Sequence, residues 1–226
     1  MNDDTRWLME IYEALLNYFG PRGWWPGETR LEIMVGAVLT QAVAWKNVTR
    51  AIDNLKADGL LDLQKLVEVP EEVLAETIRP ALYHRQKAKK IKALVGYIVE
   101  RYSGNLDEMF IQPLPELRQE LLVIWGIGPE TADSILLYAG NKNIFVIDAY
   151  TRRIFSRLGL VSEKISYHDL QQFMQERIPS DTKLYNEYHA LLVGLGAHLC
   201  KKENPGCPAC PLGKWCNYFL NLQENT

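Results

Sequence analysis

The sequence predicts an all-α protein, and three observations support that fold class. Apolar residues recur every three or four positions along most of the 226-residue chain, as they do on one face of a helix. Glycine and proline interrupt these periodic stretches where helices would begin and end. The one short apolar run that could form a strand, Ile144–Ile147, stands between two predicted helices and is better explained as an extended connector. We therefore expect about ten helices and no sheet.

Composition and charge narrow the possible functions. The chain is 47% hydrophobic and long enough to bury one substantial core or two small ones. Its net charge of −3 argues against a protein that coats nucleic acid non-specifically, but is compatible with a local basic face. No apolar run reaches membrane-spanning length, and the acidic start Met1–Asp4 does not resemble a signal peptide. We expect a cytoplasmic protein with no membrane partner.

The N-terminal part is predicted to be a series of helices. The first has an apolar face, and later ones are expected over Leu31–Gln41, Lys46–Leu55, Asp62–Val67 and Glu71–Ile78. Between the first and second helices, Trp24 and Trp25 stand in a loop flanked by glycine and proline. Two interpretations are open for this pair. The rings either plug and cover the core, or they form a surface on which a base can stack.

A basic segment follows. Seven Lys and Arg residues lie between Arg79 and Arg101 against one acid, Glu100. Such a run is usually a solvated helix face. Here the apolar residues from Ile91 to Ile98 supply a core side, so the lysines, Lys87 and Lys89 among them, are expected to point outward. On an acidic protein this is the favoured contact surface for a nucleic-acid backbone.

The next motif is a helical hairpin. A helical pattern ends at Ile124, and Gly126 and Gly128 form a tight turn. Pro129 then suits the first position of a second helix, and Glu130 suits its positive end. Gly126, Gly128 and Thr131 would let the backbone approach a phosphate closely, with N–H groups available to bind it. A Gly-x-Gly turn alone is more often an ordinary helix connector.

The residues after the hairpin strengthen its assignment. An apolar helix is expected over Ala132–Tyr138, then a turn, the connector, and Asp148 at the start of another helix. Asp148 is well placed to cap that helix. Two amphipathic helices, Tyr167–Ile178 and Leu184–Leu199, precede the C-terminal tail.

The C-terminal tail carries the most specific signal. All four cysteines of the chain lie there with the spacing Cys-x6-Cys-x2-Cys-x5-Cys, at positions Cys200, Cys207, Cys210 and Cys216. Four thiolates in a proline-rich loop indicate a metal site rather than a disulfide framework. Zinc is the alternative, but zinc ribbons usually pair two Cys-x2-Cys knuckles and only one is present. A [4Fe–4S] cluster fits better.

Taken together, the hairpin, the Asp about twenty residues later and the cysteine spacing resemble the endonuclease III superfamily of base-excision DNA glycosylases. The resemblance runs from Leu31 to Cys216. It implies a six-helix barrel over residues 31–141, with the hairpin at 121–138. It also implies a cluster domain made of residues 1–30 and 142–226, with the [4Fe–4S] loop at 200–216.

The resemblance assigns roles to two acids. Glu130 stands where bifunctional members carry the lysine that forms a Schiff base with the sugar, so strand cleavage by that route is not expected. Asp148 matches the family's catalytic aspartate, which would stabilise positive charge on the sugar and orient a water. This role is compatible with a helix cap. Glu130 either favours a cationic base at the pocket or only complements the helix dipole.

Residues 128–133 and the tandem tryptophan look most like the alkylpurine branch, the 3-methyladenine DNA glycosylase III type. The resemblance places Trp24, Trp25 and Trp45 around the flipped base, where aromatic rings would attract a cationic alkylated purine. Gln41 matches a residue that fills the vacated space in the duplex, although it could simply end a surface helix. The implied partner is double-stranded DNA with damaged bases, bound by a monomer associated with the nucleoid.

Two other functions remain open. One is a glycosylase for oxidised pyrimidines or for mismatched uracil or thymine. The other is a non-catalytic protein that binds lesions or abasic sites, against which Asp148 argues, because a pure binder needs no carboxylate beside the sugar.

Overall fold

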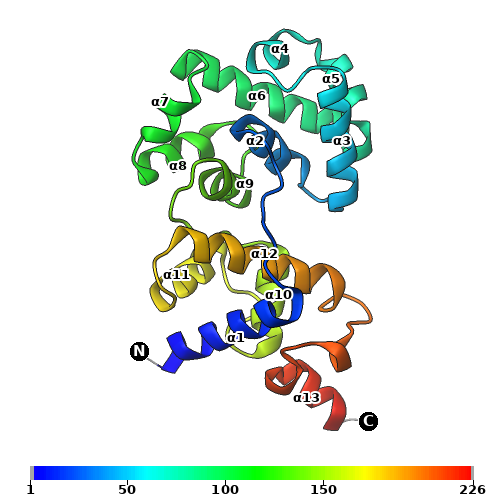
Figure 1. The fold of residues 1–226 in the computed structure, drawn as a ribbon, viewed down its shortest axis with the longest axis vertical. Coiled ribbons are helices and arrows are strands. Elements are labelled where there is room, and N and C mark those ends of the chain that lie inside the picture. The colour runs from blue at the N-terminus through cyan, green and yellow to red at the C-terminus, as the bar shows by residue number, and fades with distance from the viewer. Residues whose placement is uncertain (1–2, 225–226) are drawn as a thin grey trace. The chain divides into compact units, whose positions relative to one another are not determined.

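The computed structural model describes residues 3–224, and these residues form helices and loops without a β-strand (Figure 1). The all-α prediction is confirmed. The run Ile144–Ile147 is an extended connector, as expected. None of the helices in this described part is long and apolar enough to cross a membrane.

The chain divides into two compact units. The first, here called the terminal unit, comprises the residues up to Trp24 together with those from Asn143 onward. The second, here called the central unit, is Trp25–Lys142. The sequence placed Trp25–Arg30 with the terminal segments, but in the structure they belong to the central unit. Trp25 itself explains the difference, because its ring packs against Gly36 and lies edge-on to Trp45.

The central unit is built around α2 (Arg30–Leu39), which is mostly buried, and α6 (His84–Tyr102), which buries one face. Thr29 caps α2 by accepting a hydrogen bond from the Glu32 N–H. The other elements are α3 (Trp45–Ala57), α4 (Leu63–Glu68), α5 (Glu71–Thr77), η1 (Arg79–Ala81), α7 (Leu106–Ile111), α8 (Leu114–Val123), α9 (Pro129–Ser134) and η2 (Ile135–Ala139). Figure 1 shows α6 crossing this unit, with α3 and α5 near one end and α7 near the other.

The predicted apolar helix over Ala132–Tyr138 is divided in the structure. Helix α9 ends at Ser134, and η2 continues as a π-helical turn in which the Gly140 N–H donates to the Ile135 carbonyl. Such wide turns are rare and are often found at functional sites. Every residue of η2 is buried, including Tyr138.

The terminal unit packs α1 (Asp3–Phe19) and α10 (Ala149–Leu158) against α12 (Thr182–His198). Its core contains large side chains such as Phe155, Tyr185 and Tyr188, and the Tyr188 hydroxyl donates to the Leu8 carbonyl. The remaining elements are α11 (Tyr167–Arg177), η3 (Cys207–Ala209), η4 (Gly213–Trp215) and α13 (Asn217–Glu224). The boundaries of α11 and α12 lie within two residues of those expected from sequence.

Candidate active site and nucleic-acid interface

The hairpin lies in the central unit, between α8 and α9. Gly126 has φ +82°, a backbone conformation that favours glycine. Gly128 is the N-cap of α9, Pro129 is its first residue and Glu130 lies in its first turn. No heavy atom lies within 4 Å of a Cβ built on Gly128, so the N-terminus of α9 is open to a close approach. The turn therefore has the geometry that a backbone-gripping hairpin requires.

The hairpin is fastened to the end of α2 by Gln41. The Gln41 Nε2 group donates to the Gly126 carbonyl at 3.2 Å and to the Thr131 hydroxyl at 2.8 Å. Its Oε1 accepts a hydrogen bond from the Lys90 ammonium at 2.5 Å. Thr131 is only 5% exposed, so its side chain faces this network and only its backbone remains to bind a phosphate. Gln41 is thus committed at both ends of its amide.

The lysines of α6 correct one expectation. Lys87 was predicted to contact the DNA backbone, but it is buried, and its ammonium donates to the carbonyls of Leu39 and Ala81 at 2.8 and 2.6 Å. Burial, and to a smaller extent the charge of Lys90, lowers the pKa of Lys87 to about 8. Lys92 also turns inward and donates to the carbonyls of Val67 and Val69. Lys89 is exposed and remains a candidate for phosphate contact.

A sequence signal for this arrangement exists in retrospect. Lys87 lies four residues before Ile91, and therefore on the apolar stripe of α6 rather than opposite it. A lysine on such a stripe must find acceptors inside the protein, and carbonyls at the ends of α2 and η1 provide them.

An aromatic cluster forms beside α2. The Trp25 ring lies edge-on to Trp45 at a centroid distance of 5.3 Å and is tilted against Tyr138 at 5.4 Å. Trp25 and Trp45 also line an open pocket together with the nearly buried Glu32. Tyr138 was missed because it falls in a stretch interpreted only as core. Trp24, half-buried, belongs to the terminal unit.

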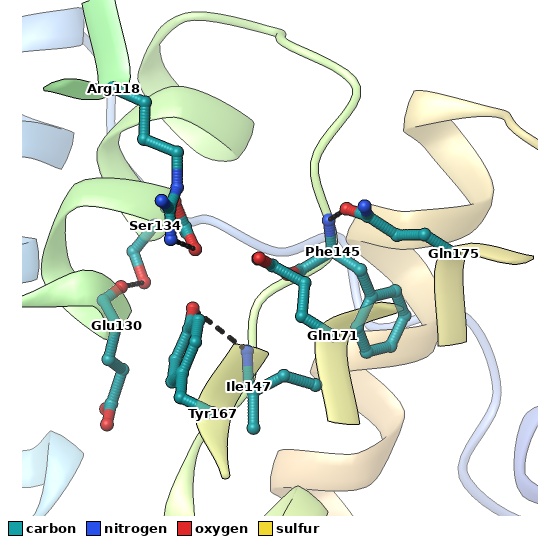
Figure 2. Close-up of polar contacts among 9 residues, drawn as sticks. Arg118, Glu130, Ser134, Phe145, Ile147, Tyr167, Gln171 and Gln175 are labelled. Carbon is teal, nitrogen blue, oxygen red and sulfur yellow. Dashed lines mark hydrogen bonds and ion pairs between the residues drawn. The ribbon is translucent and has the colours of Figure 1, made fainter. Parts of the chain in front are cut away.

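A buried ion pair joins the two hairpin helices. Arg118 of α8 donates from Nε and Nη2 to the two carboxylate oxygens of Asp133, at 2.7 and 3.1 Å. Asp133 is completely buried, and two parallel bonds of this kind fix the angle between helices as well as the distance. In Figure 2 Arg118 lies near Ser134, whose hydroxyl donates to the Glu130 carbonyl, while the Glu130 carboxylate points away from Ser134. Sequence reasoning missed both members of this pair.

Asp148 lies in the terminal unit at the N-cap of α10. Its Oδ1 accepts the Thr151 N–H at 2.6 Å, which confirms the capping interpretation. Its Oδ2 lies 3.7 Å from Nε2 of His189 on α12, and both side chains are largely buried, with 11% and 7% exposed. Burial lowers the pKa of His189, against the opposing effect of the Asp148 charge. The cap holds one carboxylate oxygen and leaves the second beside an imidazole that sequence reasoning missed.

The connector that leads to Asp148 is held by side chains of α11. Gln175 accepts the Phe145 N–H at 2.8 Å, and the Gln171 amide donates to the Phe145 carbonyl at 2.7 Å. The Tyr167 hydroxyl accepts the Ile147 N–H at 3.4 Å. Figure 2 shows these three side chains along the extended segment. Because the connector has no strand partner, these bonds satisfy its backbone and fix the approach to Asp148.

The four cysteines line one small cavity together with apolar residues and Arg157. The Arg157 guanidinium donates to Cys200 Sγ at 3.4 Å. Burial raises the pKa of Cys210 to about 11, so its thiol is protonated until a metal displaces the proton. Within residues 3–224 no three His, Cys, Asp or Glu side chains converge closely enough to hold a single metal ion. Four thiols around a cavity form a donor set that fits an iron–sulfur cluster.

Comparison with known proteins places this geometry in context. The family described as HhH-GPD superfamily base excision DNA repair protein matches residues 35–180. A Methanocaldococcus jannaschii protein assigned as a DNA repair glycosylase is 47% identical over 211 residues, which cover 92% of this chain and 95% of that protein.

Two solved structures extend the comparison. The crystal structure of Helicobacter pylori 3-methyladenine DNA glycosylase bound to 1,N6-ethenoadenine superposes with a TM-score of 0.74 at 29% identity, over 85% of this chain and 96% of that one. A non-covalent endonuclease III–DNA complex superposes with a TM-score of 0.83 at 21% identity, over 97% and 98% of the two chains.

Proposed function

Because this chain belongs to the HhH-GPD superfamily of base excision DNA repair proteins and is a DNA glycosylase, we propose that it hydrolyses the N-glycosidic bond of alkylated purines in double-stranded DNA. Its substrates would be 3-methyladenine and 7-methylguanine, and the DNA strand would stay intact. The observation that carries the proposal is the aromatic cluster of Trp25, Trp45 and Tyr138 beside the nearly buried Glu32.

The physical argument for alkylated purines concerns charge. A purine methylated at N3 or N7 is cationic, and an electron-rich ring attracts it by about 0.5–2 kcal/mol. Trp25 and Trp45 line a cavity with Glu32, whose carboxylate adds negative charge, although Lys56 pairs with it at 3.0 Å. Support also comes from the likeness to the H. pylori 3-methyladenine glycosylase, since that likeness covers most of both chains.

Asp148 would drive the chemical step. As the bond between C1′ and the base breaks, the sugar becomes positive and the cationic base leaves as a neutral purine. The Asp148 carboxylate would stabilise that charge and take a proton from the water whose oxygen bonds to C1′. His189 supports this role, because a lowered pKa keeps the imidazole neutral near pH 7 and leaves the negative charge of Asp148 uncompensated.

The hairpin favours hydrolysis without strand cleavage. Position 130, at the start of α9, carries a carboxylate, which cannot attack C1′ to form a Schiff base. The amine nearest to the hairpin in this network is that of Lys90. Its ammonium is hydrogen-bonded to Gln41 and is therefore not available as a nucleophile. Glu130 would then contribute through the dipole of α9. If Glu130→Gln left the preference for alkylated bases unchanged, this assignment would stand. If the preference were lost, Glu130 would instead act in the base pocket.

Binding of DNA would rest on the backbone of the hairpin and on exposed cations. Gly126, Gly128 and Thr131 would present N–H groups to a phosphate, and Lys89 would contact the backbone electrostatically. Neither contact reads sequence, which suits an enzyme that must search all of the chromosomal DNA. One copy of the chain carries every one of these groups, so a monomer would suffice.

The four cysteines would hold a [4Fe–4S] cluster. Cys200, Cys207, Cys210 and Cys216 would each contribute one thiolate, and the cluster would supply cross-links between segments of the loop. Arg157 orients the first of these ligands through its bond to Cys200 Sγ. The fixed loop would present the nearby lysines to phosphates.

The test is base release from methylated duplex DNA, with the products identified by chromatography. Free 3-methyladenine or 7-methylguanine from an intact strand is expected. Asp148→Asn should lower turnover by about 10³-fold with DNA binding retained, because Asn still caps α10. Borohydride should trap no covalent complex with abasic DNA. Release of oxidised pyrimidines or mismatched uracil or thymine instead would replace the substrate assignment, and tight binding without any release would make the protein a binder.

A further inference from the structure

Lys90 is a basic residue of α6 that binds another side chain, whereas Lys87 and Lys92 bind backbone carbonyls. It belongs to the run expected to face phosphates, yet it is only half exposed and its ammonium bonds to Gln41 Oε1 at 2.5 Å. Its aliphatic stem lies against the hairpin, because a Cβ added to Gly126 would approach Lys90 Cγ to 2.4 Å. Lys90 therefore contacts the hairpin twice, once directly and once through Gln41.

We propose that Lys90 is a positioning residue for DNA binding, which orients the Gln41 carboxamide so that this side chain locks the hairpin in its phosphate-binding conformation. The inference rests on the proposed role of the hairpin in DNA binding. It assigns to Lys90 a function distinct from the phosphate contact expected of Lys89.

The orientation of the amide is the first step of the argument. A carboxamide has one acceptor end and one donor end, and rotation by half a turn exchanges them. Lys90 can only donate, so it binds the oxygen and turns the Nε2 group toward the hairpin. Both groups that Nε2 meets there, the Gly126 carbonyl and the Thr131 hydroxyl, accept hydrogen bonds. Without Lys90 the reverse orientation would lose the penalty at the lysine, and only the repulsion from the Gly126 carbonyl would still oppose it.

The second step concerns what the locked amide holds. Gly126 and Thr131 stand on either side of Gly128, the N-cap of α9. Fastening both to one side chain fixes the turn whose N–H groups would meet a phosphate. A binding site that is already in its bound conformation avoids the entropic cost of ordering it during association.

The third step separates this role from direct charge attraction. A lysine that neutralises a phosphate contributes about 0.9 to the slope of log affinity against log salt concentration. A lysine that acts only by shaping the hairpin changes affinity without changing the slope. The chain offers a matched control, since Lys89 is the adjacent residue and is exposed.

The experiment uses a duplex with a tetrahydrofuran abasic analogue, which contains no base to excise, and measures binding by fluorescence anisotropy over a range of salt. Lys90→Met should weaken binding about five- to tenfold, the effect of one hydrogen bond from a charged group, with an unchanged slope. Lys89→Met should lower the slope by about 0.9. In a Gln41→Leu background, Lys90→Met should add less than about twofold, because Lys90 acts through Gln41.

Hydrogen exchange provides a second measurement. The amides of residues 126–131 should exchange faster in Lys90→Met than in Lys89→Met. A reduced salt slope for Lys90→Met, or effects of the Lys90 and Gln41 substitutions that simply multiply, would overturn the inference. Failure of the unmodified protein to bind the abasic duplex would instead contradict the proposed DNA-binding hairpin. A wrong substrate assignment would leave this experiment unaffected.

Discussion

The hairpin of the central unit and the cysteine loop of the terminal unit are both short segments joined to helices, but they are held in different ways. The hairpin is fastened by side chains from elsewhere in the sequence, Gln41 and Lys90, and by the buried pair of Arg118 with Asp133. Among the described residues, side-chain donors reach the beginning of the cysteine loop, while its end is held by the Cys216 thiol against the Arg157 carbonyl and by the Trp215 ring against Trp7.

The donors to the cysteine loop come from two arginines of α10. Arg153 donates to the carbonyls of Gly196 and Cys200, and Arg157 donates to those of Lys201 and Lys202. Beyond this point the loop forms short-range backbone hydrogen bonds, such as that from the Cys210 N–H to the Cys207 carbonyl. The hairpin is thus held by side chains from elsewhere in the sequence, whereas the cysteine loop would take further order from the cluster proposed above.

The largest effect predicted from this difference is that of removing a thiolate. Cys210→Ser should cost on the order of several kcal/mol in the stability of the loop, because ligation free energy is also folding free energy in such sites. Iron and sulfide analysis should find the cluster diminished or lost, and limited proteolysis should cut within residues 200–216. Pro208→Ala, in the same loop, is the control and should keep both iron and protease resistance. If the two variants resisted the protease equally, the protein alone would be sufficient to order the loop.

The hairpin should respond to its own glycines in two separate ways. Gly126→Ala should destabilise the protein by about 2–4 kcal/mol, since a positive φ costs about 1–2 kcal/mol and the new methyl group displaces the Lys90 stem. Gly128→Ala meets no neighbouring atom and should leave the free energy of unfolding within about 0.5 kcal/mol, while weakening DNA binding by keeping the phosphate away. Urea denaturation and anisotropy measure the two quantities. A stable Gly126→Ala protein would contradict the fastened hairpin.

These residues also mark how far sequence reasoning could reach. The cap at Asp148, the glycine turn and the helix faces depend on residues a few positions apart, and these were predicted; other caps, such as Thr29, were not. The Lys90 and Gln41 contacts join residues 49 and 85 positions apart along the chain, so no local pattern encodes them. The apolar stripe of α6 indicates that Lys87 is buried, but not that it binds the Leu39 carbonyl, 48 positions away. The His189 contact with Asp148 and the Arg118 pair with Asp133 were missed for a related reason, because each joins side chains of different elements.

Lys87 is a second long-range fastening of the central unit, and its substitution should have a smaller effect than that of Gly126. Lys87→Met should lower the free energy of unfolding by about 1–3 kcal/mol at pH 7, because two buried carbonyls lose their donor. The pKa of Lys87 is about 8 in the folded protein and near 10.5 in the unfolded chain. Between these values the unfolded chain binds more protons, so the contribution of Lys87 to stability rises with pH.

The measurement is urea denaturation of both proteins at several pH values from 7 to about 10.5. The difference between the unmodified protein and Lys87→Met should grow across this range, since all other titrating groups are common to both. Lys89→Met serves as the exposed control, with a difference near zero at each pH. A difference that shrank as the pH rose would mean that folding raises the pKa of Lys87.

The smallest predicted effect concerns how much the arginines of α10 contribute to holding the cysteine loop. Arg157→Lys removes the paired donors to the Lys201 and Lys202 carbonyls and the contact with Cys200 Sγ, because a lysine has one ammonium in place of a planar fork. The loss should be about 1 kcal/mol, seen as a several-fold faster bleaching of the visible absorbance under an iron chelator. Arg152→Lys, on the same helix, is the matched control, since its Nε has no hydrogen-bond partner in the described part of the chain. If both variants bleached at the rate of the unmodified protein, the arginines would contribute nothing to holding the loop, and its order would come from the cluster alone.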